Sequence, residues 1–195
     1  MSTNLVNVNI DLTGQYCNHW PLLKILHNNS VVYNDEIVGQ QTLTFDLDCS
    51  DKNTLTFVHY GKQFGDTGGW DKDDTSECIL TVNDIVFDGI SIGEHLKSRL
   101  VFNTHWTPYQ LENDSREFIE QYTESYCNGV ITFNGQIDLE FETPIYDWLI
   151  LNKYKVPMSS TAYFSNYSLR WHYEEDIKII NEIKQLLNLD KNSNP

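Results

Sequence analysis

Basic residues are scarce in this chain of 195 residues. It contains 13 lysines and arginines against 28 aspartates and glutamates, which gives a formal net charge of −15. A surface of that sign repels the phosphates of nucleic acids and the anionic head groups of membranes. We therefore expect no nucleic-acid partner.

Long apolar runs are also missing, because no stretch approaches the ~20 apolar residues that a membrane-spanning helix requires. The N-terminal residues 1–10 lack the basic start and apolar core of a secretory signal. These absences predict synthesis in a cytosol and no membrane insertion. The four cysteines are widely separated and form no Cys-x-x-Cys pair, so we expect neither a zinc site nor a redox motif, but reduced and mostly buried thiols.

Sequence motifs of catalysis are absent or incomplete. The chain has no Gly-x-Ser-x-Gly, His-Glu-x-x-His, phosphate loop or dinucleotide fingerprint. Asp66-Thr67-Gly68 copies the tripeptide of aspartic proteases, but it follows no apolar strand and has no second copy. Asp71-Lys72-Asp73 matches the Asp-x-Asp of metal-dependent glycosyltransferases without their alternation of helices and strands. We therefore expect that the protein is not an enzyme. A glycan-processing activity would need two carboxylic acids held close together in space, which a sequence alone does not display.

Short alternating segments dominate the first half of the chain. Residues 4–12 place Val6, Val8, Ile10 and Leu12 on one face, as in a half-buried strand. Similar segments recur about every ten residues through residue 92, a spacing typical of sandwiches. The sequence therefore predicts a mainly β protein, an antiparallel, jelly-roll-like β-sandwich.

Later segments predict a mixture of elements. Residues 94–102 fit a helical turn followed by a strand, residues 107–114 a loop, and residues 115–122 a helix. Asn134-Gly135 lies between two apolar runs, which favours a β-hairpin with a two-residue type I′ turn. Residues 143–151 carry a hydroxyl cap and a proline at the first helical position, so we expect a short helix packed on the sandwich.

The C-terminal part differs in composition. Residues 156–172 form a connector rich in tyrosine and serine, and residues 173–187 carry an apolar stripe at helical spacing. We predict a sandwich module over residues 1–155 and an appendix over 156–195 that ends in an amphipathic helix. The stripe must be covered either by the sandwich or by another subunit.

An acidic loop between two predicted strands is the candidate site. Over residues 62–77 it holds three glycines and the acids Asp66, Asp71, Asp73, Asp74 and Glu77. Calcium prefers such oxygen ligands, and glycines let them converge. Trp70 could stack on a sugar ring. The alternatives are a solvated loop without a ligand and a tryptophan that only anchors the loop. The spacing does not fit an EF-hand.

Residues 21–89 resemble the calcium-dependent xylan-binding type of carbohydrate-binding module. The matching segments are Pro21–Ile25, Asn53–Phe57, the Asp66 to Asp71 loop, and Val82–Gly89. The resemblance implies a β-sandwich in which calcium, held by loop aspartates near an aromatic ring, binds sugar hydroxyls. It places the metal at Asp66, Asp71, Asp73 and Asp74, with Trp70 and Tyr60 as sugar-binding residues. The module's Asp-Arg-Asn segment is replaced here by Lys72-Asp73-Asp74.

The chain is also similar to proteins of tailed marine bacteriophages, over residues 22–151. The shared segments are Tyr60–Lys62, Asp88–Ile90 and Phe141–Leu149. This similarity implies a structural protein of the virion, made in the host cytoplasm. Our leading hypothesis is a non-enzymatic virion protein that binds host-surface glycan with calcium. The alternative is a virion adaptor that binds other phage proteins through its C-terminal helix.

Overall fold

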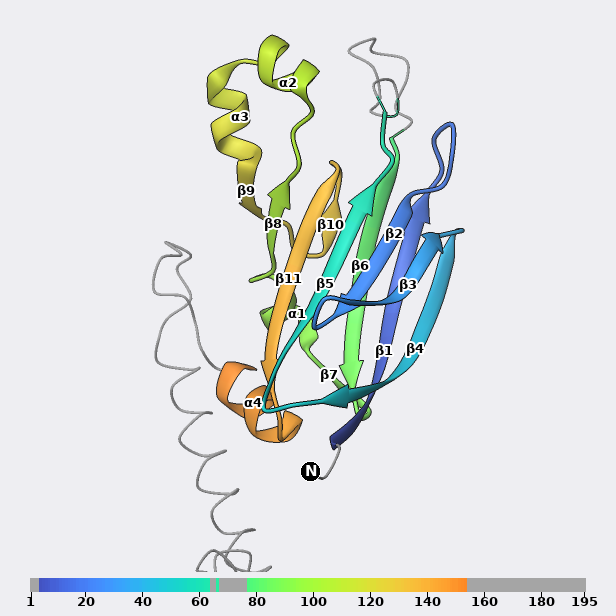
Figure 1. The fold of residues 1–195 in the computed structure, drawn as a ribbon, viewed down its shortest axis with the longest axis vertical. Helices are drawn as coiled ribbons and strands as arrows, with labels where there is room; N and C mark the ends of the chain where they lie inside the picture. Colours follow the sequence, from blue (N-terminus) through green and yellow to red (C-terminus); the bar gives the residue numbers. More distant parts are fainter. Residues whose placement is uncertain (1–3, 64–65, 67–76, 154–195) are drawn as a thin grey trace, which may run out of the picture. The chain divides into compact units, whose positions relative to one another are not determined.

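The computed structural model describes residues 4–63, 66 and 77–153, which belong to one compact unit. This unit is an antiparallel β-sandwich, as the alternation predicts (Figure 1). The predicted connector and C-terminal helix, residues 156–195, lie outside the described residues. No helix among the described residues is long and apolar enough to cross a membrane.

The first sheet is built around the long N-terminal strand. Its strands pair in the order β10–β6–β1–β4, with β7 added beside β6. The bounds are β1 (Asn4–Gln15), β4 (Gln40–Cys49), β6 (Ile79–Phe87), β7 (Ile90–Ser91) and β10 (Val130–Ile131). β1 continues past Gly14, where the backbone comes so close to Ile37 that a Cβ would lie 2.0 Å from its carbonyl oxygen. Only glycine fits there.

The second sheet has six strands in the order β3–β2–β5–β11–β8–β9. The bounds are β2 (Leu22–His27), β3 (Ser30–Glu36), β5 (Lys52–Tyr60), β8 (Val101–Thr104), β9 (Glu124–Tyr126) and β11 (Gly135–Glu142). Asn28 and Asn29 both have positive φ, 48° and 67°, and form the tight turn between β2 and β3. β5 is central, because it pairs with β2 on one side and β11 on the other.

The core lies between the sheets and follows the period-2 pattern. Val8, Ile10 and Leu12 of β1 are fully buried, as are Leu55 and Phe57 of β5. Phe87 and Phe141 extend this core, with ring centroids 4.9 Å apart. The inward positions are thus apolar, and the outward ones are mostly polar.

Four short helices complete the unit. They are α1 (Gly93–Lys97), α2 (Pro108–Asn113), α3 (Arg116–Thr123) and α4 (Ile145–Lys153). The predicted loop at 107–114 is wrong: Thr107 and Gln110 form a capping box that starts α2 at Pro108. α4 confirms the predicted helix after residue 143, with Ile145 and Leu149 buried against the core.

The predicted hairpin at Asn134-Gly135 is wrong as well. β10 pairs with β6 in the first sheet, whereas β11 pairs with β5 and β8 in the second. The dipeptide therefore passes from one sheet to the other. Gly135 is needed for close approach, because a Cβ there would lie 2.2 Å from the carbonyl oxygen of Asn103. The Asn134 side chain pairs with the backbone of Lys62, at 2.9 Å and 2.8 Å.

The cysteines are thiols, and no disulfide joins them. Cys17, Cys49 and Cys78 are buried, as expected, and Cys127 is partly buried. Burial raises the pKa of Cys49 and of Cys78 to about 11. These two thiols therefore remain protonated at neutral pH and act as small apolar groups.

Candidate functional site

The acidic loop does not join neighbouring strands of one sheet. It follows β5 in the second sheet and precedes β6 in the first, so the two strands that flank it belong to different sheets and meet it at the end of the sandwich opposite α4 (Figure 1). Its base is closed, because the amide of Cys78 donates to the carbonyl of Asp66 at 2.9 Å. Asp66 and Cys78, which flank residues 67–77, thus lie side by side.

Asp66 anchors this base from a buried position, with 4% of its surface exposed. Its Oδ2 accepts from the backbone N–H of Gln63 at 2.6 Å and from His19 Nε2 at 2.9 Å. Its Oδ1 accepts from Asn18 Nδ2 at 3.1 Å. Burial by itself raises the pKa of Asp66, but these hydrogen bonds outweigh it and hold the pKa below its usual value. Asp66 is therefore ionised at neutral pH.

His19 reaches Asp66 from the segment that follows β1. Its Nδ1 lies 2.7 Å from the carbonyl oxygen of Trp20, and its Nε2 faces the Asp66 carboxylate. Both partners only accept, so the ring satisfies both when each of its nitrogens carries a proton. The bond to Trp20 first, and then the Asp66 carboxylate, raise the pKa of His19. His19 and Asp66 thus form an ion pair at the base of the loop whenever the His19 ring is protonated.

Lys62 is the second buried ion of this region, with only 5% of its side chain exposed. Its Nζ donates to the carbonyl of Cys78 at 3.1 Å and to the carbonyl of Thr132. The carboxylate of Glu77 lies 3.7 Å away. Burial lowers the pKa of Lys62, and Glu77 opposes that shift. The lysine therefore ties the end of β5 to the first residues before β6 and to the segment after β10.

His59 lies beneath this cluster on the inner face of β5 and is fully buried. Its Nδ1 donates to the carbonyl of Phe133 at 2.7 Å. Its Nε2 has no hydrogen-bond partner among the described residues. Burial lowers the pKa of His59 to about 4, so the ring is neutral at physiological pH.

The structure describes two of the six predicted site residues, and their side chains have different partners. Asp66 is at the base of the loop. Tyr60 is on the outer face of β5, where its hydroxyl donates to Asn34 Oδ1 at 2.8 Å and Lys24 Nζ lies 5.4 Å from its ring centre. The other four, Trp70, Asp71, Asp73 and Asp74, lie outside the described residues.

The region also contains residues that the sequence did not point to. His19 and Asn18 lie far from the loop in sequence, and neither is part of a motif. Lys62 belongs to the segment Tyr60-Gly61-Lys62, in which no feature indicates a buried ammonium. A lysine directly after an apolar strand and before an acidic loop was the one available signal for it.

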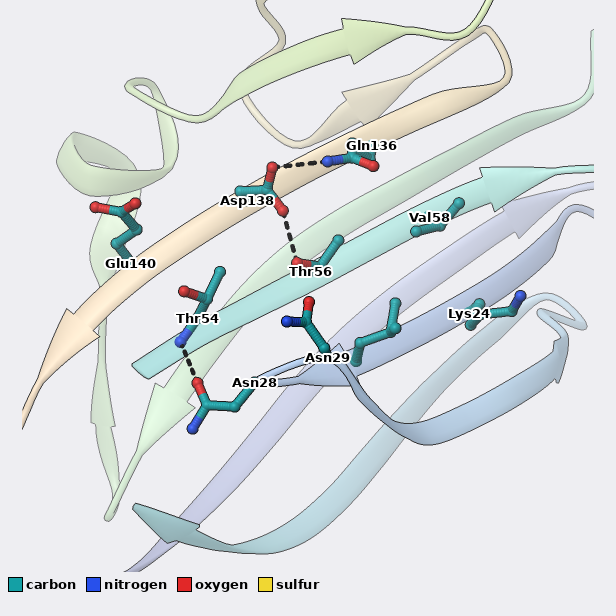
Figure 2. A pocket seen from close by; sticks show the side chains of 10 residues that line it. Lys24, Asn28, Asn29, Thr54, Thr56, Val58, Gln136, Asp138 and Glu140 are labelled. Atoms are coloured by element: carbon teal, nitrogen blue, oxygen red, sulfur yellow. Dashed lines mark hydrogen bonds between the residues drawn. The ribbon is translucent and has the colours of Figure 1, made fainter. Parts of the chain in front are cut away.

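A shallow groove of about 630 Å³ lies elsewhere, on the outer face of the second sheet (Figure 2). Its lining comes from β2, β5, β11 and the turn after β2: Lys24, Leu26, Asn28, Asn29, Thr54, Thr56, Val58, Gln136, Asp138 and Glu140. The sequence signal for it is the set of outward-facing polar positions on three strands, which can be recognised only once the order of the strands is known.

Comparison with known proteins finds a structural likeness and no family. No protein-family model and no curated protein matches the chain. One similar solved structure is vCBM60 in complex with galactobiose, with 12% identity, 68% of this chain and 95% of that chain covered, and a TM-score of 0.41. A second is a selenomethionine form of vCBM60, from work on two families of calcium-dependent carbohydrate-binding modules. It is 12% identical, covers 68% of this chain and 88% of that chain, and has a TM-score of 0.44.

The described residues do not by themselves form a metal centre. Among residues 4–63, 66 and 77–153, no three His, Cys, Asp or Glu side chains are grouped so that they could hold an ion. From residues that the structure describes, Asp66 Oδ2 accepts two hydrogen bonds and Oδ1 accepts one. Asp66 can thus contribute at most one oxygen without losing its anchoring contacts.

Proposed function

We propose that this protein is a non-enzymatic component of a bacteriophage virion that binds host-surface carbohydrate through calcium held in the loop after Asp66. The ligands would be Asp71, Asp73 and Asp74, with Oδ1 of Asp66 as a further oxygen and Trp70 beside the bound sugar. Calcium bound in this way offers open coordination positions to sugar hydroxyls. The virion setting rests on the resemblance of residues 22–151 to phage proteins.

The closed base of the loop is the observation that carries this proposal. The carbonyl of Asp66 and the amide of Cys78 are bonded at 2.9 Å, so the two residues that flank the eleven residues 67–77 lie side by side. Loops whose ends meet in this way are often functional. This one carries three aspartates and a tryptophan, and Asp66 and Lys62 fix its base.

Calorimetric titration with calcium tests the metal site. We expect the unaltered protein to bind calcium and the triple variant Asp71→Asn, Asp73→Asn, Asp74→Asn to lose at least 100-fold in affinity, because amide oxygens carry no charge to offset that of the ion. The matched control changes three exposed aspartates elsewhere in the same way: Asp35→Asn, Asp48→Asn and Asp51→Asn. Equal heats from all three proteins would remove calcium from this account.

A further inference from the structure

Several side chains that line the groove on the outer face of the second sheet are held in place by hydrogen bonds. Asp138 is held by two neighbours: Thr56 Oγ1 donates to its Oδ1 at 2.6 Å, and Gln136 Nε2 donates to its Oδ2 at 2.8 Å (Figure 2). Asn28 is fixed as well, because its Oδ1 accepts from the backbone N–H of Thr54 at 2.9 Å. These contacts orient polar groups before any ligand arrives.

Other groups in the groove keep their hydrogen-bonding capacity. Asn29 and Glu140 make no side-chain hydrogen bond with any residue that the structure describes, and Asn29 is held at the turn by its positive φ of 67°. Lys24 contributes an ammonium at the end of the groove opposite Glu140 (Figure 2). Leu26 and Val58 are half-buried and provide a small apolar floor.

The ligand must be recognised by side chains and not by backbone pairing. β2 pairs with β3 and β5, and β5 pairs with β2 and β11, whereas β11 pairs with β8 only at residues 135–137. Between β2 and β11 an added peptide strand therefore finds no open edge. The lining combines carboxylate acceptors, amides, hydroxyls and one ammonium. Such a mixture fits a ligand that offers many hydroxyl groups, each able to donate and accept.

The charge and the dimensions of the groove restrict the class of ligand further. The groove contains two carboxylates and one ammonium, and the whole chain carries a net charge of −15, so a polyanion is repelled. Three strands span about 10 Å across the groove, and the four steps from Thr54 to Val58 cover about 13 Å along it. This area matches a short, uncharged oligosaccharide.

We infer that the outer groove is a second carbohydrate-binding surface, which takes an uncharged glycan chain without calcium. The inference deepens the proposed function, because it presumes a carbohydrate-binding protein, but it places the contact on a different face of the sandwich. Asn29, Glu140 and Lys24 bind the sugar hydroxyls, Asp138 accepts from them, and Val58 and Leu26 contact the apolar faces of the rings.

Affinity electrophoresis of the full chain in gels containing neutral polysaccharides (xylan, galactan or β-glucan), with a calcium chelator, tests this surface. The test variant is Asn29→Gly with Glu140→Ala, in which glycine keeps the turn conformation. The matched control is Asn128→Gly with Glu117→Ala, another asparagine of positive φ and another exposed glutamate. Thermal unfolding verifies that both variants are folded.

We expect at least one polysaccharide to retard the unaltered protein and the control in chelator, and the test variant to bind about 10-fold more weakly. If no polysaccharide retards the protein in chelator, or if the test variant binds as well as the control, the groove is not a glycan site. The two proposals fail separately, because loss of calcium-dependent binding refutes only the loop, and loss of chelator-resistant binding refutes only the groove.

Discussion

Lys62→Ala is expected to lower the free energy of unfolding by about 3 kcal/mol. The substitution leaves the carbonyls of Cys78 and Thr132 without their ammonium donor in a region where the lysine side chain is 5% exposed. Each unsatisfied buried acceptor costs about 1–3 kcal/mol, and the ionic contact with the partly exposed Glu77 adds a smaller amount. Urea unfolding followed by tryptophan fluorescence measures the loss.

Two further variants show whether this loss comes from the buried ammonium. Lys52→Ala removes an exposed lysine at the start of β5 and should change stability by less than about 0.5 kcal/mol. Lys62→Met keeps most of the side-chain volume and avoids burying a charge, so we expect a smaller loss, about 1–2 kcal/mol. If Lys62→Ala were as stable as Lys52→Ala, Lys62 would not hold the base of the loop.

Stability is expected to fall by about 3 kcal/mol between pH 7 and pH 4 because His59 is buried as a neutral ring. Its pKa is lowered from 6.5 to about 4 in the folded protein, so the unfolded chain takes up the proton first as the pH falls. The contribution is fully present above pH 6.5 and is lost progressively down to about pH 4, at about 1.4 kcal/mol for each pH unit.

Two neighbouring groups titrate outside this window. His19, whose pKa is raised, contributes stability that is complete below pH 6.5 and is lost as the pH rises. Asp66, whose pKa is lowered, contributes stability that is complete above pH 3.8 and is lost only at lower pH. Urea unfolding of the unaltered protein and of His59→Leu at several pH values isolates the effect of His59. An equally steep pH dependence in both proteins would assign it to other groups.

The architecture was predictable because the period-2 pattern is strong wherever one face of a strand is buried. The alternation of β1 and β5 identifies these strands directly, and Asn28-Asn29 identifies the turn between β2 and β3. The sequence does not show which sheet a strand joins. Asn134-Gly135 has the composition of a hairpin turn, yet Gly135 is required because Asn103 and Phe102 pack against it.

The start of α2 and the buried face of α4 were only partly predictable from local sequence. Thr107, Pro108 and Gln110 have the spacing of a capped helix start, and the structure forms α2 there. Within the predicted helix at 143–151, Ile145 and Leu149 form the buried face of α4, whereas the equally apolar Leu151 is 61% exposed. In both cases the sequence contains the residues but does not show which tertiary contacts they make.

The candidate site was predictable only in part. The acidic composition of the loop is plain in the sequence, but the role of Asp66 depends on His19, 47 residues away. A contact of this kind arises from the closing of the sandwich and leaves no spacing pattern. The groove needs the order β2–β5–β11 before its polar positions become one surface, so no single segment reveals it.

The central claim is that the loop after Asp66 binds carbohydrate through calcium. A glycan array probed with the full chain, once with calcium and once with a chelator, tests it most directly. The account predicts a set of glycans that is bound strongly with calcium and lost or weakened by the chelator, and absent for the triple Asp71, Asp73 and Asp74 variant. An array that shows no glycan bound in calcium, or the same binding in calcium and in chelator, would contradict it.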